Sequence, residues 1–268
     1  MKYRIRGEFI LKFLIVGDVC GRPGREAFRK YVPELKKEHN IDVVVVNGEN
    51  IAGGRGISRK TLDEIYRAGA DIVTSGNHIW DQKEIVSFID DEPFLIRPAN
   101  YPEGAPGKGY CIYPFKAKNI GVINVSGRTF MPPMDCPFQK VDEILKEIKN
   151  QCDIILVDIH AEATSEKIAM GFYLDGKVTC VVGTHTHVQT ADNRILPKGT
   201  AYISDLGMVG PYNSSLGINV NNAIDKFITC RPVRFEMAEG PNIFSAVVLE
   251  LAEDNSVKSF ERILFNEE

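Results

Sequence analysis

Short runs of apolar, mostly β-branched residues recur along the chain, and each run is followed by glycine or polar residues. The runs lie at residues 13–16, 43–46, 72–74, 122–125, 154–157 and 181–182. Their apolar residues follow one another instead of alternating with polar ones, which is typical of strands covered on both faces. Segments with one apolar face lie between some of them, at 24–38, 58–69 and 140–150. These segments predict helices, the second with Ser58 as its N-cap.

The alternation of strands and helices predicts an α/β fold, a layered α/β sandwich with mixed β-sheets. Residues 243–251 and 260–265 predict two more strands, which can pair around a turn at Asp254-Asn255 and add an antiparallel part. We find no internal repeat and no convincing linker, so the sequence predicts a single domain over residues 1–268. The Pro- and Gly-rich stretch 97–114 is expected to be a surface loop.

The composition excludes several classes of protein. Hydrophobic residues make up 44% of the chain and charged residues 25%, which excludes a disordered chain, and the net charge of −4 argues against a basic nucleic-acid-binding surface. No apolar stretch approaches the roughly 18 residues of a membrane span, and no signal peptide is recognisable. The 6 cysteines form no C-x-x-C pair. We therefore expect free thiols, no membrane partner and a cytoplasmic location.

Polar side chains gather at the ends of the predicted strands, where open α/β sheets bind their ligands. The set includes four of the 5 histidines in the chain, whereas His39 ends a predicted helix and is expected to have only a structural role. His185 and His187 are two residues apart, so on an extended strand both imidazoles would face one ion. The whole set consists of carboxylate, amide and imidazole groups: Asp18, Glu49, Asn50, Asn77, His78, His160, His185 and His187.

Oxygen and nitrogen ligands without sulfur favour manganese, iron or zinc over calcium or a thiolate site. Eight groups exceed what one ion needs, and two ions bridged by one carboxylate fit the number. Two such ions can hold the attacking and leaving oxygens of a phosphoryl transfer. The sequence therefore predicts a binuclear metal centre for phosphate ester hydrolysis.

The same residues resemble the motifs of the metallophosphoesterases of the calcineurin-like superfamily. These are Gly17-Asp18, Gly48-Glu49-Asn50, Gly76-Asn77-His78, His160 and Gly183-Thr184-His185-Thr186-His187. The chain is most similar to the YmdB-type bacterial family, whose pattern is also matched at 127–130, 160–167 and 205–208. The resemblance begins near residue 11, so residues 1–10 are interpreted as an extension or a misplaced start.

The resemblance implies which groups bind metal. One ion would take Asp18, Glu49, Asn50 and His187, and the other Glu49, Asn77, His160 and His185, with Glu49 as the bridge. His78 would be the general acid that protonates the leaving oxygen. The family implies a di-iron or di-manganese centre, with zinc as an alternative, and a phosphodiesterase acting on 2′,3′-cyclic nucleotides. Cys20 stands where most superfamily members have a histidine, and Asn50 is expected to supply the missing ligand.

Some alternatives stay open at this stage. The same metals can serve a phosphomonoesterase of the 5′-nucleotidase type, and a regulatory scaffold that binds a nucleotide is a third interpretation. Arg128 is the arginine best placed to assist the site, although a surface ion pair is an equal alternative. Phe130 is expected to pack in preference to stacking on a base, and Asp81 either orients His78 or caps a helix. The segment 207–222 can shape a pocket or an interface in a homo-oligomer.

Overall fold

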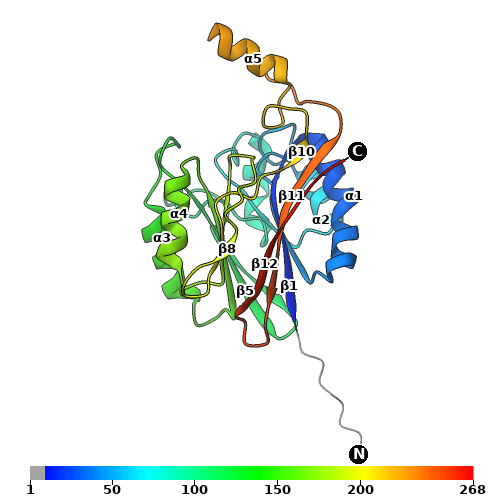
Figure 1. The fold of residues 1–268 in the computed structure, drawn as a ribbon. Helices are drawn as coiled ribbons and strands as arrows, with labels where there is room; N and C mark the ends of the chain where they lie inside the picture. The colour runs from blue at the N-terminus through cyan, green and yellow to red at the C-terminus, as the bar shows by residue number, and fades with distance from the viewer. Residues whose placement is uncertain (1–9, 268) are drawn as a thin grey trace, which may run out of the picture.

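A computed structural model describes residues 10–267. The predicted extension at residues 1–10 therefore lies, apart from Ile10, outside the described residues. The strands form two six-stranded sheets, and Figure 1 shows helices on both outer sides of the strands. None of the helices in the described range is long and apolar enough to cross a membrane.

The first sheet has the order β12-β11-β10-β1-β2-β3. Its strands are β1 (Leu11–Val19), β2 (Val43–Asn47), β3 (Ile72–Thr74), β10 (Met208–Pro211), β11 (Asn242–Leu251) and β12 (Val257–Asn266). β1, β2 and β3 are parallel, while β11 and β12 form an antiparallel pair as the sequence predicts. Two helices cover its outer face, α1 (Gly21–His39) and α2 (Arg59–Arg67), and Ser58 caps α2 as predicted.

The second sheet has the order β4-β5-β6-β7-β9-β8. Its strands are β4 (Tyr110–Phe115), β5 (Lys118–Ser126), β6 (Ile154–His160), β7 (Cys180–Thr184), β8 (Arg194–Ile195) and β9 (Ala201–Ile203). Helices α3 (Pro137–Ile148) and α4 (Thr164–Leu174) lie against its outer face, whereas α5 (Val220–Thr229) projects from one end of the molecule (Figure 1). Two 3₁₀ turns, η1 (Lys83–Ser87) and η2 (Ile89–Asp91), follow β3.

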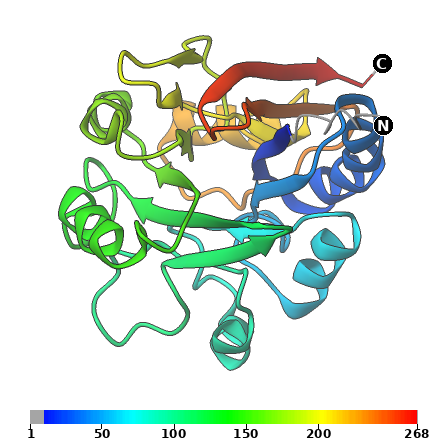
Figure 2. The ribbon, with the colours of Figure 1, turned by 90° about the horizontal axis from the view of Figure 1, so that it is seen from below.

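Each central strand is covered on both faces, which explains its continuous apolar run. In β1, Leu14 and Val16 pack toward α1 and α2, while Phe13 and Ile15 join the core between the two sheets. β6 divides its residues in the same way between the core under α3 and α4 and the inter-sheet core. The result is a four-layer α/β/β/α sandwich, visible in Figure 2 as two adjacent sheets with helices outside them.

One prediction about a connecting segment is wrong. Residues 97–114 are not all surface loop, because residues 110–114 belong to β4, which pairs antiparallel with β5. At the start of the segment, the buried Arg97 donates hydrogen bonds to the carbonyls of Pro98, Ala105 and Pro106. These bonds satisfy backbone acceptors that a Pro-rich stretch cannot pair in a sheet.

Candidate metal centre

The carboxyl ends of parallel strands from both sheets meet at one edge of the sandwich. Asp18 lies in β1, and the segments after β2 and β3 carry Glu49 and Asn77. His160 is the last residue of β6 in the second sheet, and His185 follows β7. The structure therefore brings together side chains that are far apart in the sequence. The largest separation is 169 residues, from Asp18 to His187.

These side chains form two groups of potential metal ligands that share one carboxylate. The ligand atoms of Glu49, His160 and His185 lie within 4.8 Å of one another, and so do those of Asp18, Glu49 and His187. The Nε2 atom of His160 is 3.2 Å from Glu49 Oε1 and 3.0 Å from His185 Nδ1. A buried carboxylate that belongs to both groups is the arrangement that a bridging ligand requires.

The two asparagines adjoin these groups. Asn77 Oδ1 lies 3.0 Å from His160 Nε2, and Asn50 Nδ2 lies 3.2 Å from His187 Nε2. A half-turn of the Asn50 side-chain amide would exchange its nitrogen and oxygen and turn the oxygen toward the group. Cys20 Sγ is 3.7 Å from the other ring nitrogen of His187, but within the described part of the chain it belongs to neither group of ligand atoms.

Two observations indicate that these side chains fit metal ions. Asp18 Oδ1 is a buried oxygen without a hydrogen-bond partner among residues 10–267, which is costly unless a cation satisfies it. Gly76 lies against the second group, where a Cβ would come within 2.3 Å of both Glu49 Oε2 and His160 Nε2. Only glycine therefore lets the backbone after β3 approach these ligand atoms so closely.

Burial and close neighbours shift the pKa values of the group strongly. Burial raises the pKa of Asp18 to about 7, although His187 and His160 oppose the shift. Burial also raises the pKa of Glu49, but the attraction of His160 and His78 outweighs it and lowers that pKa to about 2. Burial, with the repulsion of His160, lowers the pKa of His185 to about 3. Such clusters of perturbed groups occur at functional sites.

His185 and His187 lie in different groups of potential ligands, so the expectation that their spacing directs both imidazoles to the same side is wrong. The prediction assumed extended backbone, whereas β7 ends at Thr184 and both histidines have positive φ values, 101° and 64°. The turn directs His185 toward His160 and Glu49, and His187 toward Asp18 and Glu49. For residues with a Cβ, such conformations cost on the order of 1–3 kcal/mol each, so the surrounding structure must hold the turn.

Asp205 stabilises this turn through hydrogen bonds to Thr186. Its Oδ2 atom accepts hydrogen bonds from the backbone N–H of Thr186, at 3.0 Å, and from its hydroxyl, at 2.7 Å. Lys167 of α4, which is 1% exposed, compensates the buried charge at 2.6 Å. The sequence contained both residues within motifs of the family pattern, but it gave no sign that they pair.

We expect Lys167→Met to lower the free energy of unfolding by about 3–5 kcal/mol, because it leaves the Asp205 carboxylate buried without its cation. At this chain length, the melting temperature should fall by roughly 10 °C, which calorimetry can measure. Lys177→Met is the control, since Lys177 forms an exposed ion pair with Asp142 and should contribute at most about 1 kcal/mol. Equal melting temperatures for the two variants would contradict this account.

His78 lies beside the two groups. Its backbone N–H donates to Glu49 Oε2 at 3.1 Å, and its Nδ1 atom is 2.9 Å from Asp81 Oδ2. Asp81 was expected either to orient His78 or to cap a helix, and the structure shows the contact with His78. Gln82, not Asp81, occupies the cap position of the following turn η1.

A cavity of about 290 Å³ opens beside these residues. His78, Glu49, Asn50, His185 and His187 line it, together with Cys20, Arg55, Glu162 and the apolar side chains of Leu216, Ile218 and Met237. Segment 207–222 thus shapes a pocket, and the carbonyl of Leu216 lies 3.1 Å from His187 Nδ1. If that nitrogen carries the proton, Nε2 is left free on the side of Asp18.

The cavity contains a different arginine from the one predicted. Arg128 is absent from the described lining and instead contacts Cys136 Sγ. Arg55 is the arginine in the lining, and the Gly-rich loop that carries it directly follows Glu49-Asn50, which is a signal that sequence reasoning missed. The expected packing of Phe130 is also wrong, because its side chain is 90% exposed.

Comparison with known proteins agrees with the fold and identifies the family. Residues 14–263 match the model of the YmdB-like protein family. The chain is 51% identical over 260 residues to a Bacillus subtilis protein named 2′,3′-cyclic-nucleotide 2′-phosphodiesterase, covering 96% of this chain and 98% of the relative.

Two solved structures are similar over almost the whole chain. A phosphatase from Mycoplasma pneumoniae superposes with a TM-score of 0.92 at 35% identity, covering 97% of this chain and 95% of the other. A hypothetical protein from Thermus thermophilus gives a TM-score of 0.91 at 40% identity, with 96% and 100% covered. The fold and these relatives define a metallophosphoesterase, an enzyme class that works with bound metal ions. Within that class, the chain belongs to the YmdB-like family.

Proposed function

We propose that this enzyme is a phosphodiesterase that hydrolyses 2′,3′-cyclic nucleotides with two transition metal ions, iron or manganese in preference to zinc. The single observation that carries the proposal is the buried Glu49, which is shared by two groups of potential ligands. The name of the B. subtilis relative, at 51% identity, supports the choice of substrate.

One ion would be held by Asp18, Glu49, Asn50 and His187. The other would be held by Glu49, Asn77, His160 and His185. When bound, such a pair of cations supplies Lewis acidity that activates water and neutralises charge on the phosphoryl oxygens. Behind His160, Thr184 contacts Nδ1 at 2.9 Å and donates to the buried Asp158 carboxylate at 2.8 Å, which keeps Nε2 directed at Glu49.

His78 is the proposed general acid. Its contact with Asp81 fixes one ring nitrogen, and its ring lines the cavity where a phosphate ester would bind. A protonated imidazole there can transfer a proton to the departing sugar oxygen, which is a poor leaving group as an alkoxide. Arg55 is the lining cation that can attract the ester's negative charge.

The cavity wall suits a nucleotide substrate. Leu216, Ile218 and Met237 provide apolar surface beside the imidazole groups, which fits the organic part of a nucleotide. The preference for a diester rests on the name of the B. subtilis relative, because a nucleoside monophosphate has the same organic part. The phosphatase from M. pneumoniae keeps monoester hydrolysis as the second candidate.

Metal removal and replacement test the proposal. We expect chelation to abolish hydrolysis of a 2′,3′-cyclic nucleotide and of a bis-aryl phosphate, and Mn²⁺ or Fe²⁺ to restore both activities. The matched aryl monophosphate should be hydrolysed at least about tenfold more slowly. Faster monoester hydrolysis would favour the phosphomonoesterase. A metal-loaded protein that hydrolyses neither class of ester would favour a regulatory scaffold.

The cysteines support a reducing compartment as the location. All of them, from Cys20 to Cys230, are free thiols, as expected from their spacing. Disulfides are rare in such compartments, so the proposed place of action is the cytoplasm.

A further inference from the structure

A second and larger cavity, of about 480 Å³, lies between α1 and α2 on the outer helical layer. Five of its lining residues are basic: Arg22, Arg25, Arg29, Lys60 and Arg67. The lining also contains two glutamates, so its side chains carry a net charge of 5 − 2 = +3, although the whole chain carries −4. Asp63, outside the lining, pairs with Arg67 at 3.5 Å, and a net positive charge still remains at this place.

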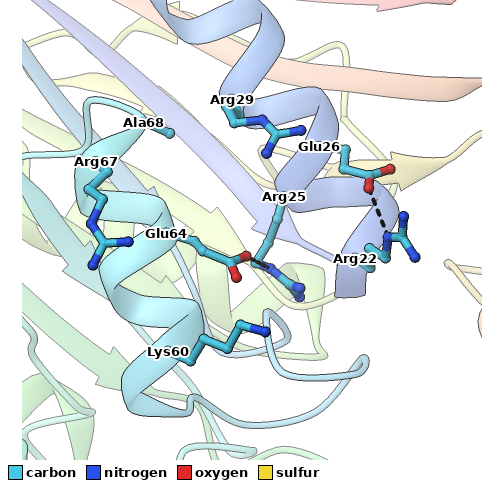
Figure 3. A pocket seen from close by; sticks show the side chains of 8 residues that line it. All are labelled: Arg22, Arg25, Glu26, Arg29, Lys60, Glu64, Arg67 and Ala68. Atoms are coloured by element: carbon cyan, nitrogen blue, oxygen red, sulfur yellow. Dashed lines mark hydrogen bonds and ion pairs between the residues drawn. The ribbon is translucent and has the colours of Figure 1, made fainter.

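The two helices present these cations to one space. On α1, Arg22, Arg25 and Arg29 are spaced by three and four residues, so they share a helix face. On α2, Lys60 and Arg67 are about two helical turns apart, so they also share a face. Figure 3 shows Arg25 of α1 meeting Glu64 of α2 across the space between the helices.

The carboxylates of the cavity are already paired. Glu64 binds Arg25 at 2.7 Å, and Glu26 binds the exposed Arg22 at 2.8 Å. Within residues 10–267, Arg29 and Lys60 have no ion pair or side-chain hydrogen bond, although both join Arg25 in lowering the pKa of Glu64. Both side chains are exposed, so the cavity keeps two cations available for an external anion.

The chemistry of the lining indicates the class of anion. Arginine forks bind phosphate oxygens in pairs, and a lysine adds a point charge. Among the described residues, the lining of this cavity contains no aromatic side chain on which a base could stack. We propose that this cavity binds a compound carrying a linear pyrophosphate or triphosphate group, recognised through its phosphates and not through a base.

The cavity is connected to the metal centre through the chain. Arg25 also donates to the carbonyl of Ile51, and the N–H of Gly21, at the start of α1, donates to the carbonyl of Asn50 at 2.9 Å. The segment that carries Glu49 and Asn50 is thus tied to the helix that lines the cavity. A ligand that displaces Glu64 from Arg25 would therefore bind the same side chain that holds the carbonyl of Ile51, next to Asn50.

Binding of inorganic triphosphate and of ATP, measured by calorimetry, tests the proposal. Each titration uses the full chain, once loaded with metal and once after chelation, so that binding at the metal centre is recognised by its dependence on metal. After chelation, we expect the dissociation constants of inorganic triphosphate and of ATP to agree within about threefold. The double variant Arg29→Ala/Lys60→Ala should weaken this binding by about tenfold or more.

The control is Lys37→Ala/Lys146→Ala, which removes the same charge from exposed positions outside the cavity. It should leave the affinity unchanged. Equal weakening by both double variants, or no metal-independent binding below millimolar ligand, would overturn the proposal and identify a solvated basic surface. Binding of ATP without binding of inorganic triphosphate would overturn recognition through phosphates. These outcomes do not depend on the reaction at the metal centre.

Discussion

Replacing Glu49 by glutamine is expected to weaken metal binding in both groups of ligands and to reduce turnover on the order of a thousandfold. The side chain is 1% exposed and contacts His160, Asn50 and the backbone of His78. Glutamine keeps the shape and can keep hydrogen bonds, but it removes the charge that two cations would share. Metal content per chain, measured by elemental analysis after gel filtration, is the primary readout.

Glu38→Gln is the matched control for this prediction. Glu38 lies near the end of α1, outside the cavity beside the metal centre, and its side chain is 71% exposed. The control should keep both metals and change turnover by less than about tenfold. Full metal occupancy at both positions in Glu49→Gln, with the fold intact by circular dichroism, would show that Glu49 does not bridge.

His78→Ala is expected to keep both metals and to lose activity by about 10²–10⁴-fold. The contact of residue 78 with Glu49 uses the backbone N–H, which alanine retains. The ring itself is therefore dispensable for holding Glu49, and its loss should affect only the proton transfer. Metal analysis and turnover on the same preparation separate these two effects.

The leaving group provides a further test of the role of His78. A nitrophenolate departs without protonation, so the variant should lose much less activity on bis-nitrophenyl phosphate than on a cyclic nucleotide. Asp81→Asn weakens the contact between residue 81 and His78 Nδ1. This variant should lose less activity than His78→Ala, and again more on the cyclic nucleotide than on bis-nitrophenyl phosphate. If His78→Ala instead loses one metal, or slows both substrates equally, His78 is not the general acid.

Much of the fold could be predicted because the signals are local. The apolar run in β1 and the cap at Ser58 each depend on a few neighbouring residues, and both are confirmed. α4 and α5 were not predicted. α4 carries the buried Lys167 within a mixed pattern and lacks the clear apolar stripe of α3. α5 does have such a stripe, which the structure leaves largely exposed, so its helical pattern was available in the sequence.

The candidate site was only partly readable from the sequence. All eight predicted groups lie at or just after the carboxyl ends of strands that meet at one edge of the sandwich, because parallel strands end on the same side. Spacing alone misled at His185 and His187, since the backbone leaves the extended conformation directly after Thr184. The Lys167–Asp205 pair is a contact across the fold, and the residues around each partner do not show the other. Arg55, in contrast, lies in the loop directly after Glu49-Asn50, so its place beside the site could have been predicted.

The sequence by itself determined the central strands and the polar groups at their ends, because an apolar run and the residues that follow it are local features. Only the tertiary structure decided that β1–β3 and β6–β7 belong to different sheets whose edges adjoin. That packing divides the ligands into two groups around Glu49 and places α1 against α2 to form the basic cavity. The order of strands and the docking of helices depend on burial between distant segments, which no local pattern records.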